Sequence, residues 1–406
     1  MPKDEFADAR TRSLCTDCGL SRTDDPGRCG KACQFIRPDY AGLEVQVHGR
    51  SRNAAKEEER FFGPYQSMHR AWAKTPSDGA QWSGLTTRIA EKLLETNAVE
   101  AVLTVVPDAD DRWKPVPALI TKAGEMARAR GMRMGYAPLL ALLEPARDQG
   151  IRRIAVIGIP CQIYALRAIE EELGFDALYV IGTPCSDNTT TKNFRDFLGR
   201  LTDRPDEVSY LEFRADYQVE MRFDDGAQKE VPFLKLPISD LPPDFFPLTC
   251  RTCVDYTNSL ADITVGYMAG QGEQWLIVRN ARGQELIDLL GDDVRLAPVG
   301  TKGKRESAVK GFITNTKLAA GGLPLRRMPD WLRPIMAWLQ PKIGPQGIEF
   351  ARARLEMKAA ETVLHLRRHH PKRMKYMIPQ HVWDLVAPYG ITPEEGEAPV
   401  PATQRK

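Results

Sequence analysis

Eight cysteines constrain this chain more than any other feature of its sequence. They form an N-terminal group of four, two single cysteines that each follow a short apolar run, and a late C-x-x-C pair. In chain order these are Cys15, Cys18, Cys29 and Cys33, then Cys161 and Cys185, then Cys250 and Cys253. Thiolates grouped in this way are ligands for soft metal, either zinc or iron–sulfur clusters. Two groups of four predict two metal centres.

Composition and charge exclude several classes of protein. The chain has 406 residues, which is enough for two or three domains with a large core. Lys and Arg number 56 against 54 Asp and Glu, so no overall field favours nucleic acid as a partner. The start of the chain lacks the apolar centre of a signal peptide, and no run approaches the ~18 apolar residues of a membrane-spanning helix. We therefore expect a cytoplasmic protein with reduced thiols, which disfavours a disulfide framework.

Residues 1–75 are predicted to be a cluster-binding segment. Glycines and a proline separate its cysteines, so residues 1–40 have the character of a loop. Metal–sulfur bonds can order a segment that is too polar to build its own core. The spacing C-x2-C-x10-C-x3-C leaves zinc and iron–sulfur equally open at this point.

Residues 76–300 have the pattern of an α/β core. Continuous apolar runs of strand length alternate with segments of helical spacing, which is typical of a mostly parallel sheet covered on both faces. The predicted strands are 98–106, 154–159, 177–181, 261–267 and 274–278, and the predicted helices are 86–96, 118–130, 138–148 and 163–173. An antiparallel meander is predicted at 207–235, where apolar and polar residues alternate around an Asp-Asp-Gly turn.

The C-terminal part is predicted to be a helical region followed by a disordered tail. Residues 301–392 have mostly helical spacing, and residues 393–406 are rich in Pro and Glu. An apolar patch runs from Trp331 to Leu339, and we interpret it as core in preference to a membrane contact. A basic run at 367–375 indicates a solvated helix face, with an acidic electron carrier as the alternative partner.

The chemistry is expected where the central strands end. Cys161 and Cys185 each follow a predicted parallel strand, and open α/β sheets place their ligands at that edge. The segment 78–87 is rich in small and hydroxyl residues and runs into a helix, so its amides could hold a phosphate, although an ordinary capped helix is favoured. No G-x-G-x-x-G follows a strand, which argues against a standard dinucleotide fold. His48 is a further candidate, although such a histidine is more often structural.

Several motifs resemble the family that contains the β subunit of deazaflavin-reducing hydrogenase. Within it, the chain is most similar to the branch of ferredoxin-dependent divinyl chlorophyllide 8-vinyl reductase and 7-hydroxymethyl chlorophyll a reductase. The motifs are C-T-D-C-G-L at 15–20, V-H-G-R at 47–50, G-A-Q-W-S-G at 79–84, P-C-Q at 160–162, the run 250–268, V-R-N at 278–280 and I-G-P at 343–345. The chain departs from the family at Ser21, where a third cysteine is usual, and Cys29 is the residue that keeps the total at eight.

The resemblance implies FAD and two 4Fe-4S clusters, with all eight cysteines as ligands. Which four hold which cluster stays open, since clusters can draw ligands from distant segments. The flavin contacts that it implies are Gln81, Trp82, Ser83, Gly84, Thr86, Thr87, Asn188 and Arg279. Tyr256 and His48 are the residues that we consider for the proton donor.

The activity implied is reduction of the 8-vinyl group of divinyl chlorophyllide or protochlorophyllide in (bacterio)chlorophyll biosynthesis, with ferredoxin as the electron donor. Two alternatives stay open: reduction of 7-hydroxymethyl chlorophyll a, and reduction of a deazaflavin within a hydrogenase or formate dehydrogenase complex. A zinc-stabilised binding protein is the remaining non-enzyme interpretation. The family also implies a homo-oligomer, with a trimer as one form. A peripheral location at photosynthetic membranes is the alternative to a purely cytoplasmic one.

Overall fold

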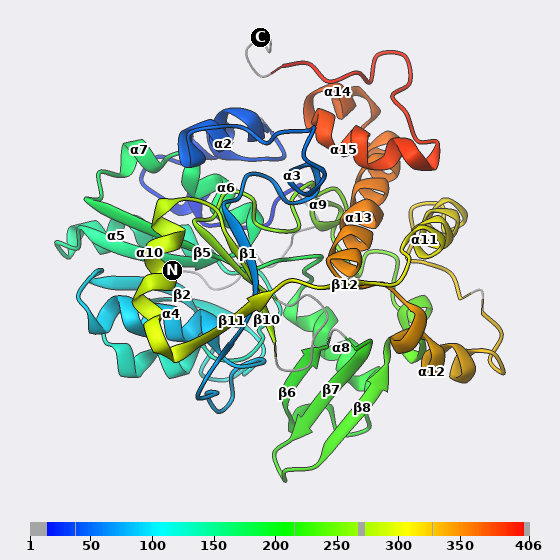
Figure 1. Ribbon diagram of the computed structural model, residues 1–406, viewed down its shortest axis with the longest axis horizontal. Helices are drawn as coiled ribbons and strands as arrows, with labels where there is room; N and C mark the ends of the chain where they lie inside the picture. The colour runs from blue at the N-terminus through cyan, green and yellow to red at the C-terminus, as the bar shows by residue number, and fades with distance from the viewer. Residues whose placement is uncertain (1–13, 37, 215, 267–272, 327, 402–406) are drawn as a thin grey trace.

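A computed structural model describes residues 14–36, 38–214, 216–266, 273–326 and 328–401, and one large mixed sheet forms its centre (Figure 1). In order across the sheet, the strands are β11 (Val294–Pro298), β1 (Ser67–Ala73), β10 (Gln274–Val278), β9 (Ile263–Gly266), β5 (Ala177–Gly182), β4 (Arg153–Gly158), β2 (Ala101–Pro107) and β3 (Pro115–Ile120). β9, β5, β4 and β2 pair in parallel, and the other pairings are antiparallel. The predicted α/β character is confirmed, but the sheet is mixed and not mostly parallel.

The antiparallel edges include three strands that sequence patterns did not predict, β1, β3 and β11. β1 lies within the predicted N-terminal segment 1–75, yet it pairs with both β10 and β11. β3 occupies the start of the predicted helix 118–130, and the rest of that stretch is a 3-10 helix at Ala123–Ala129. Pro115 and Pro117 lie in β3, which is tolerated because β3 is an edge strand, where a missing N–H need not break a ladder.

Helices cover both faces of the sheet, which explains the continuous apolar runs of its strands. Along β4, Ile154 and Val156 pack on one face, and Ala155 between them packs on the other. The first face is covered by α2 (Tyr40–His48), α5 (Leu143–Asp148) and α6 (Pro160–Arg167). The second is covered by α4 (Leu85–Glu95) and α10 (Ala281–Leu290).

The predicted antiparallel meander is confirmed as a separate three-stranded sheet, which projects from the body of the molecule in Figure 1. Its strands are β6 (Val208–Phe213), β7 (Gln218–Phe223) and β8 (Gln228–Pro232). Their apolar side chains share a core with α8 (Thr191–Leu201), which gives the meander its own buried face.

The C-terminal region is helical, as predicted, and packs beside the sheet (Figure 1). Its helices are α11 (Glu306–Leu318), α12 (Arg333–Ile343), α13 (Ile348–His369), α14 (Met374–Met377) and α15 (Gln380–Val386). Two-residue strands β12 (Thr301–Lys302) and β13 (Gln346–Gly347) pair at the start of α13. Four short helices complete the described chain: α1 (Arg28–Ala32), α3 (Glu57–Phe62), α7 (Glu170–Leu173) and α9 (Leu248–Arg251).

The tail differs from the disorder predicted for 393–406. Glu397 is buried and accepts a hydrogen bond of 2.6 Å from Nη2 of Arg367, and the amide of Val400 donates to the carbonyl of Lys375 over 2.8 Å. The prediction of disorder rested on a composition rich in Pro and Glu, which does not reveal these contacts with α13 and α14. Residues 402–406 lie outside the described part of the chain, as do residues 1–13. None of the helices in the described ranges is long and apolar enough to cross a membrane.

Candidate functional site

The N-terminal group of four cysteines comes together around α1 and a preceding 3-10 turn. The pKa of Cys18 is raised to about 12, chiefly by burial and then by the charges of the other three thiols. The pKa of Cys33 is raised to about 11, again by burial first and then by Cys29 and Cys15. The four thiols therefore lie within reach of one another's charge.

Backbone amides are directed at three of these sulfur atoms. Each donor follows its cysteine by two or three residues: Asp17 donates to Cys15, Leu20 to Cys18, and both Phe35 and Ile36 to Cys33. Such bonds favour the charged form of sulfur and lower the pKa against the larger effect of burial. The local backbone is thus arranged to stabilise thiolates.

The second group of cysteines lies where two parallel strands end, as the sequence predicts. Cys161 is the second residue of α6, directly after β4, and Cys185 lies three residues beyond β5. Cys250 and Cys253 come from α9 and the turn that follows it. Burial raises the pKa values of Cys161 and Cys185 well above their usual range, and charges of other members of the group raise them further.

Buried charged side chains border this second group. Lys358, from α13, donates to Oδ1 of Asp187 over 2.7 Å and to Glu361 over 3.4 Å. Burial raises the pKa of Cys250 to about 12 and that of Cys253 to about 11, and the Lys358 charge opposes both shifts. A fixed cation at this place stabilises negative charge on the thiols.

The two cysteine groups are neighbours in space. A side-chain hydrogen bond joins Thr16 of the N-terminal segment to Cys161, and Nε2 of Gln34 lies 3.8 Å from Sγ of Cys253. Burial, and then the charges of thiols from both groups, raise the pKa of Tyr136. The buried hydroxyl of Tyr136 has no hydrogen-bond partner among the described residues. All eight cysteines therefore belong to one continuous region.

The segment predicted to contact a flavin forms a tight loop before α4. Trp82 and Gly84 both have positive φ, at 48° and 82°. The hydroxyl of Ser83 is buried and lies 3.0 Å from both the amide of Ala73 and Oε1 of Gln274. Gly84 and Thr87 are buried as well, whereas Gln81, Trp82 and Thr86 stay partly exposed. The accessible part of this segment is therefore smaller than the sequence suggests.

A cavity of about 480 Å³ lies beside this loop. The residues that line it include Gly79 of the loop, Trp113, Arg130, Arg133, and Tyr210 and Arg222 of the meander. The Nε atoms of Arg130 and Arg133 are buried and lack hydrogen-bond partners within the described chain, and burial lowers the pKa of Arg133. Guanidinium groups suit phosphate, and the aromatic side chains suit a flat ring.

The two remaining predicted flavin contacts lie in well-defined surroundings. Asn188 exchanges side-chain hydrogen bonds with the backbone of Gly135, and its own amide donates to Cys250. Arg279 is buried and donates to four oxygens, those of Phe62, Pro64, Thr257 and Thr264. Asn188 thus borders the second cysteine group, and Arg279 has a structural role between segments.

The two residues considered for the proton donor lie in different places. Tyr256 is buried, and its carbonyl accepts a hydrogen bond of 3.0 Å from the amide of Cys185, next to the second cysteine group. His48 lies with Nε2 2.8 Å from the carbonyl oxygen of Ser259. Burial, and then the charge of Arg279, lower the pKa of His48 to about 3, so its ring is neutral at ordinary pH.

Sequence reasoning missed Arg130, Arg133 and Lys358. The arginines belong to the run R-A-R-G-M-R at 128–133, whose basic character was a usable signal. Lys358 shares the buried face of α13 with Leu355 and Thr362. A lysine at an apolar helical position of this kind indicates a buried charge that needs a partner.

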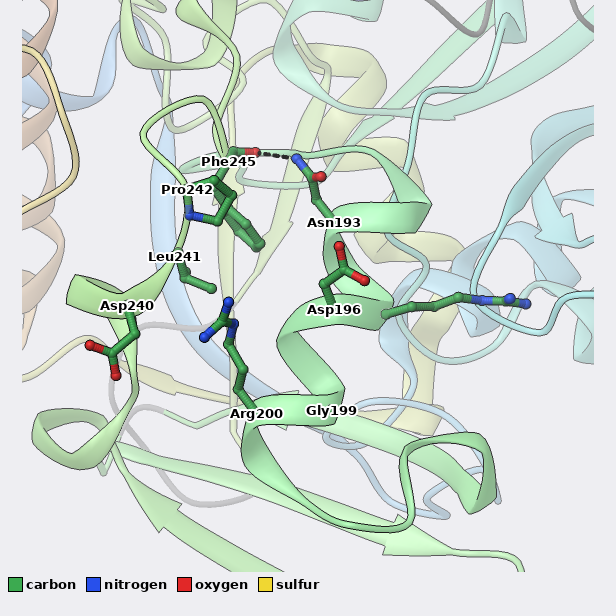
Figure 2. Close-up of a pocket in the computed structure, with 9 residues that line it drawn as sticks. Asn193, Asp196, Gly199, Arg200, Asp240, Leu241, Pro242 and Phe245 are labelled. Atoms are coloured by element: carbon green, nitrogen blue, oxygen red, sulfur yellow. Dashed lines mark hydrogen bonds between the residues drawn. The ribbon is translucent and has the colours of Figure 1, made fainter.

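A larger cavity, of about 630 Å³, lies between α8 and the segment 240–245 (Figure 2). Nδ2 of Asn193 donates to the carbonyl of Phe245 over 3.1 Å at its border, and the side chain of Arg200 extends toward Leu241. None of the residues predicted for catalysis, flavin or metal is among those that line it. Volume alone therefore does not identify the functional site.

Comparisons with known proteins place the chain in a family. The N-terminal model of the coenzyme F420 hydrogenase/dehydrogenase β subunit matches residues 68–144, and the C-terminal model matches residues 151–299. An uncharacterized protein of Nostoc sp. is 36% identical over 94% of this chain and 94% of its own length. The chloroplastic 7-hydroxymethyl chlorophyll a reductase of Oryza sativa subsp. japonica is 35% identical over 92% of this chain and 82% of its own length.

More distant relatives share part of the chain and the fold. The β subunit of coenzyme F420 hydrogenase from Methanococcus voltae is 26% identical over 56% of this chain and 81% of its own length. A chain of the F420-reducing NiFe hydrogenase complex from Methanosarcina barkeri is 18% identical and superposes with a TM-score of 0.54 over 73% of this chain and 91% of its own. This protein is an oxidoreductase of the family of coenzyme F420 hydrogenase/dehydrogenase β subunits, in the branch that includes 7-hydroxymethyl chlorophyll a reductase.

Proposed function

We propose that the protein is a ferredoxin-dependent reductase of a chlorophyll-type tetrapyrrole that holds two 4Fe-4S clusters and one FAD. The observation that carries the cofactor part is the placement of eight cysteines as two neighbouring groups of four, with amide donors directed at sulfur in both. The tetrapyrrole part rests on the named plant relative.

Clusters are proposed in preference to zinc because the chain belongs to a family of redox proteins and brings two sets of four thiols together. A structural zinc ion on four thiolates would carry no electrons. A 4Fe-4S cluster is also held by four thiolates and can pass on single electrons.

The cavity beside the 78–84 loop suits the flavin. Arg130 and Arg133 line the cavity and would meet the pyrophosphate of FAD through their guanidinium groups, and Trp82 and Trp113 offer apolar surface nearby. Bound FAD would supply hydride chemistry, which pairs the single electrons that ferredoxin delivers. Cys250 is buried and the other three thiols of the second group are partly exposed, and Lys358 of α13 holds positive charge beside them.

The substrate in this proposal is the 8-vinyl group of divinyl chlorophyllide or its protochlorophyllide precursor. Its conversion to ethyl consumes two electrons and two protons, which two reduced ferredoxins and an acid or water can provide. The second candidate is 7-hydroxymethyl chlorophyll a, favoured by the relative from Oryza sativa, whose name states that reaction. That reduction consumes the same electrons and protons and releases water.

The cofactors are tested by purifying the full chain without oxygen and measuring iron, sulfide, zinc and flavin. We expect about eight irons, about eight sulfides and about one FAD per chain. Cys18→Ala and Cys250→Ala should each lose about half of the iron, because they remove one ligand from different groups. The conservative Thr249→Ser, next to Cys250, serves as the matched control and should keep the full iron content of the parent. A colourless zinc protein would refute the proposal.

The substrate is tested by supplying reduced ferredoxin with each pigment in turn. Conversion of the 8-vinyl to the 8-ethyl compound, followed by chromatography and absorption, supports vinyl reduction. Conversion of 7-hydroxymethyl chlorophyll a with no vinyl reduction would select the second candidate. Reduction of a deazaflavin alone, with neither pigment consumed, would overturn the tetrapyrrole assignment while leaving the cofactors in place.

A further inference from the structure

Helix α12 carries a large apolar face that no described part of the chain covers. Trp331, just before the helix, is 72% exposed, and Ile335, Trp338 and Ile343 are 48%, 64% and 59% exposed. Positions 331, 335 and 338 are spaced by four and three residues, so these side chains lie on one side. The sequence interpretation of this patch as core is therefore wrong for its largest side chains.

The opposite side of α12 is attached to the protein. Ala337 is buried, and the Arg333 guanidinium donates to the carbonyl of Leu234 over 2.9 Å, next to the end of β8. Figure 1 shows α12 at the periphery of the molecule, beside β8. One side of α12 therefore packs against the meander, and the tryptophans lie on the other side, which faces outward.

The segment that carries this apolar face is positively charged. Residues 317–343 contain five Lys or Arg and one Asp, in a chain whose formal net charge is only +2. Lys342 follows Trp338 by one helical turn, and its Nζ lies 3.3 Å from the centroid of the Trp338 ring. Asp330 pairs with Arg326, so the only carboxylate of the segment is already neutralised. Lys342 therefore lies on the same side of α12 as Trp338, within a segment of net positive charge.

We propose that α12 docks the protein onto an anionic lipid bilayer, with the helix lying in the plane of the interface. Tryptophan is the side chain most favoured at headgroup depth, since its ring is apolar and its N–H stays hydrated. Lys and Arg beside it attract anionic headgroups. An 11-residue helix with one apolar side is suited to lie on a membrane, and it is too short to span one.

Charge complementarity distinguishes this occupant from a second copy of the chain. The centre of a protein interface is depleted in lysine, whereas Lys342 stands within the apolar face of α12. A second copy would also present the same positive charges, which would repel. The inference does not depend on the reaction catalysed, and its test needs no substrate.

The test is flotation of the full-length protein with vesicles of phosphatidylcholine, with and without phosphatidylglycerol. We expect co-flotation with anionic vesicles, weaker binding to neutral ones, and loss of binding at high salt. Replacing both Trp331 and Trp338 by Ala should lower the partition coefficient by about tenfold or more. Lys342→Glu should lower it roughly tenfold for anionic vesicles only, because it reverses one charge.

The matched control removes exposed apolar side chains elsewhere. Val45 on α2 is 51% exposed and Leu296 on β11 is 37% exposed, so their double replacement by Ala should leave flotation unchanged. Quenching of tryptophan fluorescence by brominated lipid should fall only in the α12 variant. Flotation equal in the α12 variant and the parent would overturn the proposal. So would an absence of flotation combined with a change from oligomer to monomer in the α12 variant, which would assign the face to a second copy.

Discussion

Asp262 shows how a few buried charges hold the centre of this fold together. Its carboxylate accepts hydrogen bonds from Arg167 over 2.8 Å, from Asn280 over 2.7 Å and from the amide of Val180 over 2.7 Å. The side chains of Asp262 and Arg167 are both fully buried. Asp262 lies just before β9 and Val180 is in β5, so the carboxylate joins adjacent parallel strands to the helix that carries Cys161.

Asp262→Ala should therefore destabilise the protein strongly. It leaves the buried Arg167 with Glu170 as its remaining carboxylate partner, and removal of one partner from a buried ion pair typically costs about 3–5 kcal/mol. Thermal unfolding of the anaerobic protein measures the effect as a fall in Tm. The control is Asp196→Ala, which breaks an exposed pair with Lys192 and should cost about 0.5 kcal/mol or less. Equal shifts in the two variants would contradict the role given to Asp262.

His48 should make the fold sensitive to acid. Its folded pKa of about 3 lies below its usual value of 6.5, because burial and Arg279 disfavour the charged ring. Below about pH 6.5 the unfolded chain binds a proton that the folded protein refuses, so stability is lost as the pH falls toward 3. At about pH 5, His48→Gln should recover roughly 2 kcal/mol of that loss relative to the parent.

The measurement compares Tm near neutral pH and near pH 5 in parent and variant. His370→Gln is the control. Burial also lowers the pKa of His370, but this side chain is only partly buried, so burial disfavours its charged form less than that of His48. A His48 variant that loses as much stability in acid as the parent would show that this ring is protonated in the folded state.

Residue types predicted the cysteine site better than its surroundings. The grouping of thiols followed from spacing and from two strands that end just before Cys161 and Cys185. The basic run around Arg130 and the apolar helical position of Lys358 were signals in the sequence, but their partners could not be predicted because they lie far away in the chain. Lys358, for example, faces Asp187, which is 171 positions earlier.

At the scale of elements, strands that are buried on both faces were predictable, whereas the edge strand β3 and the partly exposed strand β1 were not. β4 and β5 are continuous apolar runs, and the structure places them within a residue or two of the expected ranges. The A-L-I run of β3 continues into residues with helical propensity, so its pattern favours a helix, and only pairing with β2 makes it a strand. β1 has mixed burial, so its pattern carries little information until β10 and β11 lie beside it.

Gly347 is the residue that shapes the entry into α13. Its φ is 61° and its ψ is −131°, a conformation that other residues rarely adopt, and a Cβ there would lie 2.0 Å from the carbonyl oxygen of Gly300. Gly347→Ala should therefore cost more than about 2 kcal/mol, since the backbone of β12 must move. Gly390→Ala is matched in φ, at 72°, but its Cβ would meet nothing, so about 1 kcal/mol is expected.

Thermal unfolding of both glycine variants gives the comparison. A large fall in Tm for Gly347→Ala with a small one for Gly390→Ala would show that the contact between the β12–β13 pair and α13 is rigid. Similar small shifts in Tm for both variants would mean that the backbone around Gly300 can move to make room for the added methyl group.

On the scale of the whole molecule, residues 14–36 are held in place by the buried side chains of Leu20, Ala32 and Phe35 and by polar contacts. Among them, the amide of Leu140 donates to the carbonyl of Cys18 over 2.9 Å, and Arg28 pairs with Glu144 at 2.6 Å. The helices of this segment are only three and five residues long. A segment with so little regular structure gains its order from bonds that tie it to other parts of the chain, which sequence periodicity does not report.

If metal supplies those bonds, removing iron should loosen this segment selectively. Hydrogen exchange measured before and after anaerobic chelation should rise strongly in residues 14–36, because only a few apolar side chains anchor them and ligation by four thiolates would supply the remaining order. Exchange in β4 and β5 should change little, since burial of both faces protects them regardless of metal. Unchanged exchange in 14–36 after complete loss of iron would show that the polar contacts with Leu140 and Glu144 suffice. A rise spread equally over the sheet would show that the second group of thiols, at the ends of β4 and β5, holds the parallel strands together.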